Sequence, residues 1–167
     1  MKNLYLSGTA LLLASIAPAS AETSWEYRVI NDGFTDKTHH VATVNNLSLS
    51  PSENFRAGFE CRGGKQFVFT VRANRNLGGR NKPFKLDYRA DDKRVKSVKM
   101  RTFTNSDSGG LNRIRAIDVA NDFINAERIR VRMITKNGDQ FSTELSVENA
   151  TPSILQAVQA CGLTVGQ

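Results

Sequence analysis

Apolar and polar side chains alternate with a period of two through most of the chain, which is the pattern of strands that bury one face. The period predicts strands at residues 24–31, 41–49, 55–61, 67–73, 84–89, 95–103, 129–133 and 140–147. The clearest of these are residues 55–61 and 67–73, because apolar residues occupy every second position on both sides of the Gly63-Gly64 turn: Phe55, Ala57, Phe59, Cys61, Phe67, Phe69, Val71 and Ala73. We therefore expect residues 55–73 to form a hairpin.

The segments between the predicted strands contain turn-forming residues. Residues 74–82 have a Gly pair and no apolar period, so we expect an exposed loop there. Residues 105–110 are the most polar Gly-containing run of the chain and predict a mobile loop. Asn137-Gly138 predicts a type I′ turn between the last two strands, since both residues tolerate a positive φ.

Two short helices complete the predicted set. Apolar residues at helical spacing predict the first over residues 117–126. The second opens with Thr151 as N-cap and Pro152 in the first helical position, and Gly162 closes it in a left-handed cap. The sequence thus predicts a mostly β fold, an antiparallel β-sandwich or small barrel with two short helices, one of them C-terminal.

The first residues of the chain have a different pattern. Lys2, an apolar stretch over residues 10–16 and the small residues Ala19-Ser20-Ala21 predict a signal peptide at residues 1–21. Residues 22–167 then form a single β-rich domain. No other apolar stretch approaches the ~20 residues that a membrane helix needs. We expect a periplasmic or secreted protein without a transmembrane segment in its mature chain.

Export changes the interpretation of the two cysteines, because disulfides persist in oxidising compartments. Cys61 lies on the apolar face of its predicted strand and Cys161 on the inner face of the C-terminal helix. A bond between them would close a loop of about 100 residues and contribute on the order of 4 to 5 kcal/mol. The alternatives are two free thiols or a catalytic cysteine, and neither residue belongs to a Cys-x-x-Cys motif.

Composition adds a basic charge to this picture. The 23 Lys and Arg exceed the 16 Asp and Glu, so the formal net charge is +7 and anionic partners are favoured. The basic residues that form a row on one predicted strand, or crowd the strand at residues 95–103, are Arg128, Arg130, Arg132, Lys96 and Arg101. Such rows bind phosphates or carboxylates; the alternative is an ordinary solvated outer face of an antiparallel sheet.

The candidate partners are an anionic cell-wall glycan, lipid A phosphates or an acidic surface of an envelope or secretion-system protein. Export and the lack of a base-stacking platform disfavour nucleic acid.

Motifs for catalysis and metal binding are missing from the sequence. There is no Gly-x-Ser-x-Gly elbow, His-Glu-x-x-His, Gly-rich phosphate loop or EF-hand spacing. His39 and His40 are adjacent, so in a strand they point to opposite faces and do not converge on one metal. Asp91 and Asp92 lie beside Lys93 in a predicted solvated turn. We expect neither an enzyme nor a bound cofactor.

Several short motifs carry a resemblance to a known family. They are Trp25 followed by Asp32 and Thr35-Asp36, the run Leu86-Asp87-Tyr88-Arg89-Ala90-Asp91, Phe123-Ile124 before the arginine row, Phe141, and a terminal helix that ends in Cys161. Together they resemble the VasI-like proteins, exported accessory proteins encoded with bacterial type VI secretion systems and also found outside them. The resemblance implies a periplasmic β-rich fold and a role in the envelope or in secretion, without catalytic residues.

A second hypothesis is a periplasmic inhibitor or immunity protein that blocks a cell-wall hydrolase. Residues 59–69 resemble the Cys-plus-Gly hairpin of periplasmic lysozyme inhibitors, although the Ser-Ala-Ser-Gly inhibitory loop of those proteins is missing. A basic inhibitor is also a poor electrostatic match for a basic lysozyme. A third hypothesis, a small hydrolase, has no set of catalytic residues to support it. The sequence therefore favours a non-catalytic binding or accessory protein.

Overall fold

The computed structural model describes residues 24–46 and 54–166. Nine strands and two helices follow along this part of the chain: β1 (Glu26–Asp32), β2 (Lys37–Asn46), β3 (Phe55–Arg62), β4 (Gln66–Ala73), β5 (Pro83–Ala90), β6 (Lys96–Thr102), β7 (Ser108–Leu111), α1 (Arg113–Phe123), β8 (Ile129–Ile134), β9 (Gln140–Leu145) and α2 (Ala150–Ala160). The predicted mostly β fold with two short helices, one of them C-terminal, is confirmed. The predicted signal peptide at residues 1–21 and the end of the strand at 47–49 lie outside the described residues.

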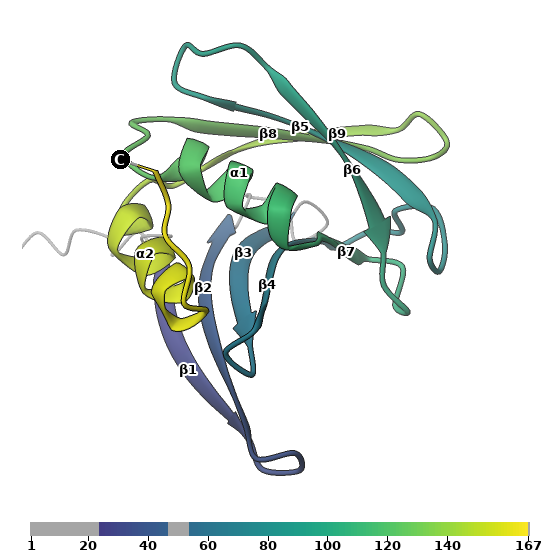
Figure 1. The fold of residues 1–167 in the computed structure, drawn as a ribbon. Coiled ribbons are helices and arrows are strands. Elements are labelled where there is room, and N and C mark those ends of the chain that lie inside the picture. The colour runs from purple at the N-terminus through teal and green to yellow at the C-terminus, as the bar shows by residue number, and fades with distance from the viewer. Residues whose placement is uncertain (1–23, 47–53, 167) are drawn as a thin grey trace, which may run out of the picture.

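All nine strands belong to one antiparallel sheet in the order β1-β2-β3-β4-β7-β6-β5-β8-β9. The sheet bends, so that β1–β4 form one half and β5, β6, β8 and β9 the other (Figure 1). Phe55 of β3 stacks on Phe141 of β9 with ring centroids 6.1 Å apart, which brings the two halves together. Within the described residues no ladder joins β1 to β9, so the fold is sandwich-like and the sheet does not close into a barrel.

Both helices pack on the same face of the first half-sheet. Phe123 of α1 meets Phe59 and Phe69 edge to face, with centroids 6.0 and 5.9 Å away, and it meets Tyr88 of the second half at 5.6 Å. Because Phe123 is fully buried among rings from both halves, it helps to fix the angle between them. The core therefore lies between the two half-sheets and the helices.

The strand β7 corrects the prediction of a mobile loop at residues 105–110. Ser108–Leu111 pairs with β4 on one side and β6 on the other, and thus joins the two half-sheets. A Cβ on Gly109 would lie 2.4 Å from the carbonyl oxygen of Arg101 and 2.4 Å from a ring carbon of Phe84. Because two of its residues are glycines, this segment shows no alternation of apolar and polar residues. The absence of their side chains allows the neighbouring strands and Phe84 to lie close to the β7 backbone.

The predicted disulfide is present. Cys61 of β3 is bonded to Cys161 after α2, with their Cα atoms 5.5 Å apart. Gly162 adopts the expected left-handed conformation, with φ at 62°. Its N–H donates to the Gln159 carbonyl at 2.9 Å, and the next N–H, from Leu163, reaches the carbonyl at position 158 at 3.2 Å, which completes a Schellman motif.

The start of α2 differs from the prediction. The helix begins at Ala150, after Asn149 in a left-handed conformation, and not with Thr151 as N-cap. The Thr151 hydroxyl instead accepts a hydrogen bond at 2.8 Å from the backbone N–H of Asn125, just beyond α1. The side chain that looked like a local cap thus connects the ends of two helices.

The β8–β9 turn also differs from the prediction. Only Gly138 has a positive φ, of 91°, and Asn137 does not. The Gly138 N–H donates to the Thr135 carbonyl at 3.1 Å, and the Thr135 N–H donates to the Asp139 carbonyl at 2.9 Å. These bonds define a three-residue loop in which a type I turn precedes a left-handed glycine, in place of the predicted type I′ turn.

Several boundaries shift by a few residues. The helix α1 starts at Arg113, four residues before the predicted start, and β2 starts at Lys37, also four residues early. In the predicted loop at residues 74–82, Leu77 is completely buried. None of the helices in the described residues is long and apolar enough to span a membrane.

Candidate functional site

The second half-sheet has one buried and one solvent-facing side. Leu86 and Tyr88 of β5 and Val131 and Met133 of β8 are buried toward the core, so the residues between them point outward. We call the charged side chains on this solvent-facing side the basic outer face. It comprises residues of β6, β5, β8 and β9, together with Arg128 just before β8: Lys99, Arg101, Lys85, Asp87, Arg89, Arg128, Arg130, Arg132 and Glu144.

Asp87 is the buried carboxylate of this face, with 4% of its surface exposed. Its Oδ2 accepts from Arg132 Nη2 at 2.7 Å, and its Oδ1 accepts from the Ser97 hydroxyl at 2.6 Å and from Lys85 Nζ at 3.0 Å. Burial alone would raise the pKa of the Asp87 carboxyl, but the hydrogen bonds from Ser97, Arg132 and Lys85 outweigh it and hold the pKa below its ordinary value. Asp87 is therefore a fixed negative charge that holds Arg132 against the sheet.

Arg89 and Arg130 lie directly opposite each other on β5 and β8. Both reach the same carboxylate oxygen of Asp92, Arg89 Nη2 at 3.1 Å and Arg130 Nη2 at 3.8 Å. The Nε atoms of both arginines are buried and have no hydrogen-bond partner within the described residues. The pair is thus incompletely hydrogen-bonded.

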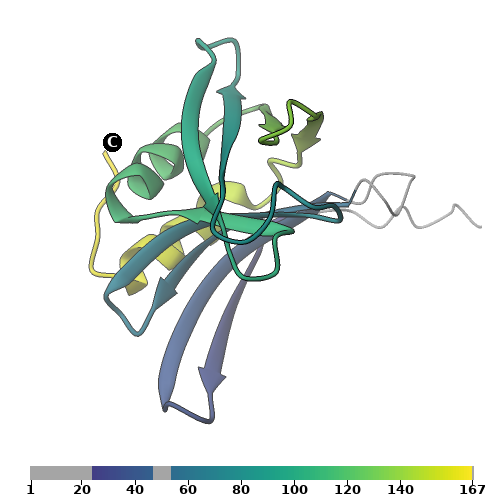
Figure 2. The ribbon, with the colours of Figure 1, turned by 90° about the vertical axis from the view of Figure 1, so that its right-hand side faces the viewer.

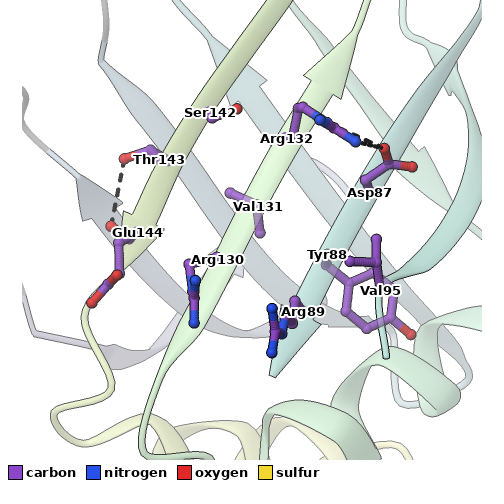
Figure 3. A pocket seen from close by; sticks show the side chains of 10 residues that line it. All are labelled: Asp87, Tyr88, Arg89, Val95, Arg130, Val131, Arg132, Ser142, Thr143 and Glu144. Atoms are coloured by element: carbon purple, nitrogen blue, oxygen red, sulfur yellow. Dashed lines mark hydrogen bonds and ion pairs between the residues drawn. The ribbon is translucent and has the colours of Figure 1, made fainter. Parts of the chain in front are cut away.

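A shallow hollow of about 380 Å³ lies on this face. Figure 3 shows its lining, with Arg132 turned toward Asp87 and with Arg89 and Arg130 turned together toward one end of the strands. Val95, with 48% of its surface exposed, adds an apolar side chain to the lining. The hollow therefore offers cationic donors beside a small apolar surface.

The structure brings most of the predicted basic residues together. Arg128, Arg130 and Arg132 share the basic outer face, where Arg128 Nε donates to Glu144 at 2.7 Å. Arg101 lies on the same face, in the strand β6. Lys96 does not, because it has the opposite phase on β6 and its ammonium binds Asp122 of α1 at 2.7 Å.

Sequence reasoning missed Asp87 and Arg89 as members of this face. Both alternate with Leu86 and Tyr88, so the two-residue period contained the signal, but only the pairing of β5 with β8 shows which charges are opposed. The Tyr88 hydroxyl donates to Asp122 Oδ2 at 2.7 Å on the core side. Burial, and then the hydrogen bond to that carboxylate, raise the pKa of Tyr88 far above its ordinary range, so Tyr88 stays neutral.

The histidines and the turn aspartates have structural partners. His39 Nδ1 lies 3.0 Å from Glu60 Oε1, and His40 Nδ1 lies 2.6 Å from the Tyr27 hydroxyl. Asp91 Oδ1 accepts backbone N–H bonds from residues 127 and 128 at 2.7 and 2.9 Å. Over residues 24–46 and 54–166 no group of His, Cys, Asp and Glu is placed to hold a metal ion.

Comparison with known proteins finds no matching family model, no matching curated protein and no matching solved structure. The resemblance to the VasI-like proteins therefore stays a prediction.

Proposed function

We propose that this chain is a non-catalytic binding protein of the bacterial envelope that engages an anionic partner through the basic outer face. The observation that carries the proposal is the direct opposition of Arg89 and Arg130, both of which reach the exposed carboxylate of Asp92. Lys99 and Arg101 extend the positive charge along β6 and have no ion-pair partner among the described residues. Because the acids of this face are already engaged by arginines or lysines, the surface presents a net positive charge to solvent.

Location in the periplasm and an accessory role in type VI secretion belong to this proposal. The predicted signal peptide and the Cys61–Cys161 bond support export, since such a bond persists in an oxidising compartment. The motifs that resemble the VasI-like proteins support the accessory role. Candidate partners are an envelope or secretion-system protein with an acidic surface and an anionic cell-wall or lipid component.

The experiment is a retention assay with the oxidised mature chain on envelope extract at low and high salt, with mass spectrometry and glycan analysis of the retained material. The test variant replaces Arg128, Arg130 and Arg132 by Gln. The control replaces Arg28, Lys37 and Lys65 by Gln, which removes the same charge from exposed positions on the other half-sheet. We expect salt-sensitive retention that the test variant loses and the control keeps. Equal retention by both variants contradicts the proposal.

A second candidate, a protein inhibitor of a cell-wall hydrolase, is favoured by the β1–β2 hairpin. The hairpin projects from the body of the molecule (Figures 1 and 2), and the side chain of Phe34 at its tip is fully exposed to solvent. The turn is ordered by Asp32, which accepts from the Phe34 N–H at 2.9 Å and from the Thr35 hydroxyl at 2.6 Å. A rigid turn that presents an aromatic side chain suits insertion into an enzyme cleft.

This candidate is tested by peptidoglycan turnover with a panel of lysozymes and lytic transglycosylases. Inhibition that Phe34→Ala abolishes, and that the arginine-to-glutamine triple variant keeps, would favour the inhibitor over the anion-binding protein. Absence of inhibition across the panel, together with salt-sensitive retention, favours the first proposal.

A further inference from the structure

We infer that Arg89 and Arg130 form a binding site for a phosphate monoester. The inference deepens the proposed function and rests on it, since it names the anionic group that the basic outer face recognises. The group could be carried by a lipid headgroup or by a soluble molecule, and both sources share the same dianionic chemistry.

The register of β5 and β8 places two like charges side by side. Arg89 and Arg130 are directly opposed, an arrangement that destabilises a sheet when both side chains carry the same charge. The acid within reach of both, Asp92, has a side chain that is 95% exposed and carries one negative charge for two guanidinium groups. Glu144 lies opposite Arg130 on β9 and is also engaged by Arg128 Nε at 2.7 Å, so positive charges outnumber negative ones around the pair.

Two hydrogen-bond donors of the site have no acceptor within the described residues. Arg89 Nε and Arg130 Nε are both buried, and each is without a hydrogen-bond acceptor among the described residues. Buried donors are nearly always hydrogen-bonded, so two without an acceptor on opposed arginines are unusual. Because both Nε atoms are shielded from solvent, a bound anion reaches them when the guanidinium groups turn outward into the hollow. Both side chains line the hollow of about 380 Å³, which leaves room for a ligand.

The donor geometry of the two arginines favours a phosphate over a carboxylate. Asp92 already presents a carboxylate to both arginines, and both Nε donors remain unused. A phosphate monoester has three terminal oxygens and close to two negative charges, which matches two guanidinium forks. The exposed Val95 in the same hollow can contact the organic part of the ester.

The experiment follows the arginine Hε resonances of the oxidised mature chain by NMR during titration with a sugar phosphate, with acetate as the carboxylate comparison. We expect selective shifts of Arg89 and Arg130 with the sugar phosphate and none with acetate at equal ionic strength. Arg89→Gln and Arg130→Gln should each weaken binding about tenfold or more. The control Arg28→Gln should change it less than about twofold, since Arg28 lies on β1 of the other half-sheet and is paired with Glu26.

Asp92→Asn should change the affinity in the opposite direction. It removes the carboxylate that competes for both arginines, so we expect tighter binding of the sugar phosphate. Vesicles that contain phosphatidic acid, compared with zwitterionic vesicles, separate a lipid source from a soluble one, and binding to either phosphate source supports the inference. Equal shifts with acetate would overturn the inferred phosphate site. The same holds if the variants at positions 89 and 130 bind both phosphate probes as tightly as the native chain does.

The proposed function and this inference fail in different ways. Salt-sensitive envelope binding that needs Arg128 and Arg132 but not Arg89 would leave the proposed function standing and remove the phosphate site. Failure to retain any envelope component and failure to bind any anion would remove both.

Discussion

Gly109 of β7 is packed so closely that a side chain has no room. A Cβ there would lie 2.4 Å from the backbone oxygen of Arg101, which cannot move without breaking the β6–β7 pairing. We expect Gly109→Ala to lower the free energy of unfolding by about 1–3 kcal/mol, measured by urea denaturation. Gly33→Ala is the matched control, because nothing lies within 4 Å of its Cβ position, and it should stay within about 0.5 kcal/mol of the native chain. Equal urea midpoints for the two variants would contradict this account of β7.

The buried Asp87 makes stability depend on pH. Its pKa in the folded chain is lowered because hydrogen bonds from Ser97, Arg132 and Lys85 outweigh the effect of burial. The carboxylate therefore contributes its full stabilisation above the unfolded pKa, near 4, and loses it as pH falls through the lower pKa of the folded chain. We expect Asp87→Asn to be less stable at pH 7 by roughly 1.5–3 kcal/mol, and to lose less stability on acidification than the native chain.

Urea denaturation at pH 7 and at pH 2 to 3 checks this prediction. Asp92→Asn is the control, since the side chain of Asp92 is 95% exposed and its removal should hardly change stability at either pH. If Asp87→Asn loses as much stability on acidification as the native chain, Asp87 does not carry the pH dependence.

At the scale of elements, the sequence predicts strands well where apolar residues alternate and poorly where glycine replaces them. The hairpin at residues 55–73 is confirmed because Phe55, Phe59, Phe67 and Phe69 mark the buried face at every second or fourth position. The strand β7 has no such mark, since its packing requires the absence of side chains. The sequence predicts only part of the basic outer face. The arginine row on β8 is visible in the sequence, but the pairing of Arg130 with Arg89 depends on the order of the strands, which no local pattern encodes.

The β8–β9 turn allows a prediction about an element. Because Gly138 has a φ of 91° and Asn137 does not have a positive φ, only the glycine is conformationally required. We expect Gly138→Ala to destabilise the chain by about 1–2 kcal/mol and Asn137→Ala to be nearly neutral. Thermal unfolding of both variants measures the difference. A similar loss of thermal stability at the two positions would instead support the type I′ turn.

At the scale of the whole molecule, several connections hold the half-sheets and helices together. The strand β7 joins the halves through the backbone, Phe123 packs between them, and the disulfide fastens α2 to β3. The basic outer face lies on the second half-sheet, away from the disulfide on the first. Stability and ligand binding are therefore separable by mutation.

The disulfide tests that separation. Cys61 and Cys161 are 100 residues apart in sequence, so their bond restricts the unfolded chain strongly and contributes on the order of 4 to 5 kcal/mol. We expect the double variant Cys61→Ala, Cys161→Ala to melt about 10–20 °C lower in calorimetry, and reduction of the native chain to have a similar effect. The bond acts mainly on the unfolded state, and α2 keeps a hydrogen bond of 3.4 Å from the Ser153 hydroxyl to the carbonyl of Trp25, the residue before β1. The folded fraction should therefore keep its affinity for anions. An unchanged melting temperature would show that packing alone holds α2 in place. A loss of anion affinity in the folded fraction would show that binding at the basic outer face depends on the disulfide of the first half-sheet.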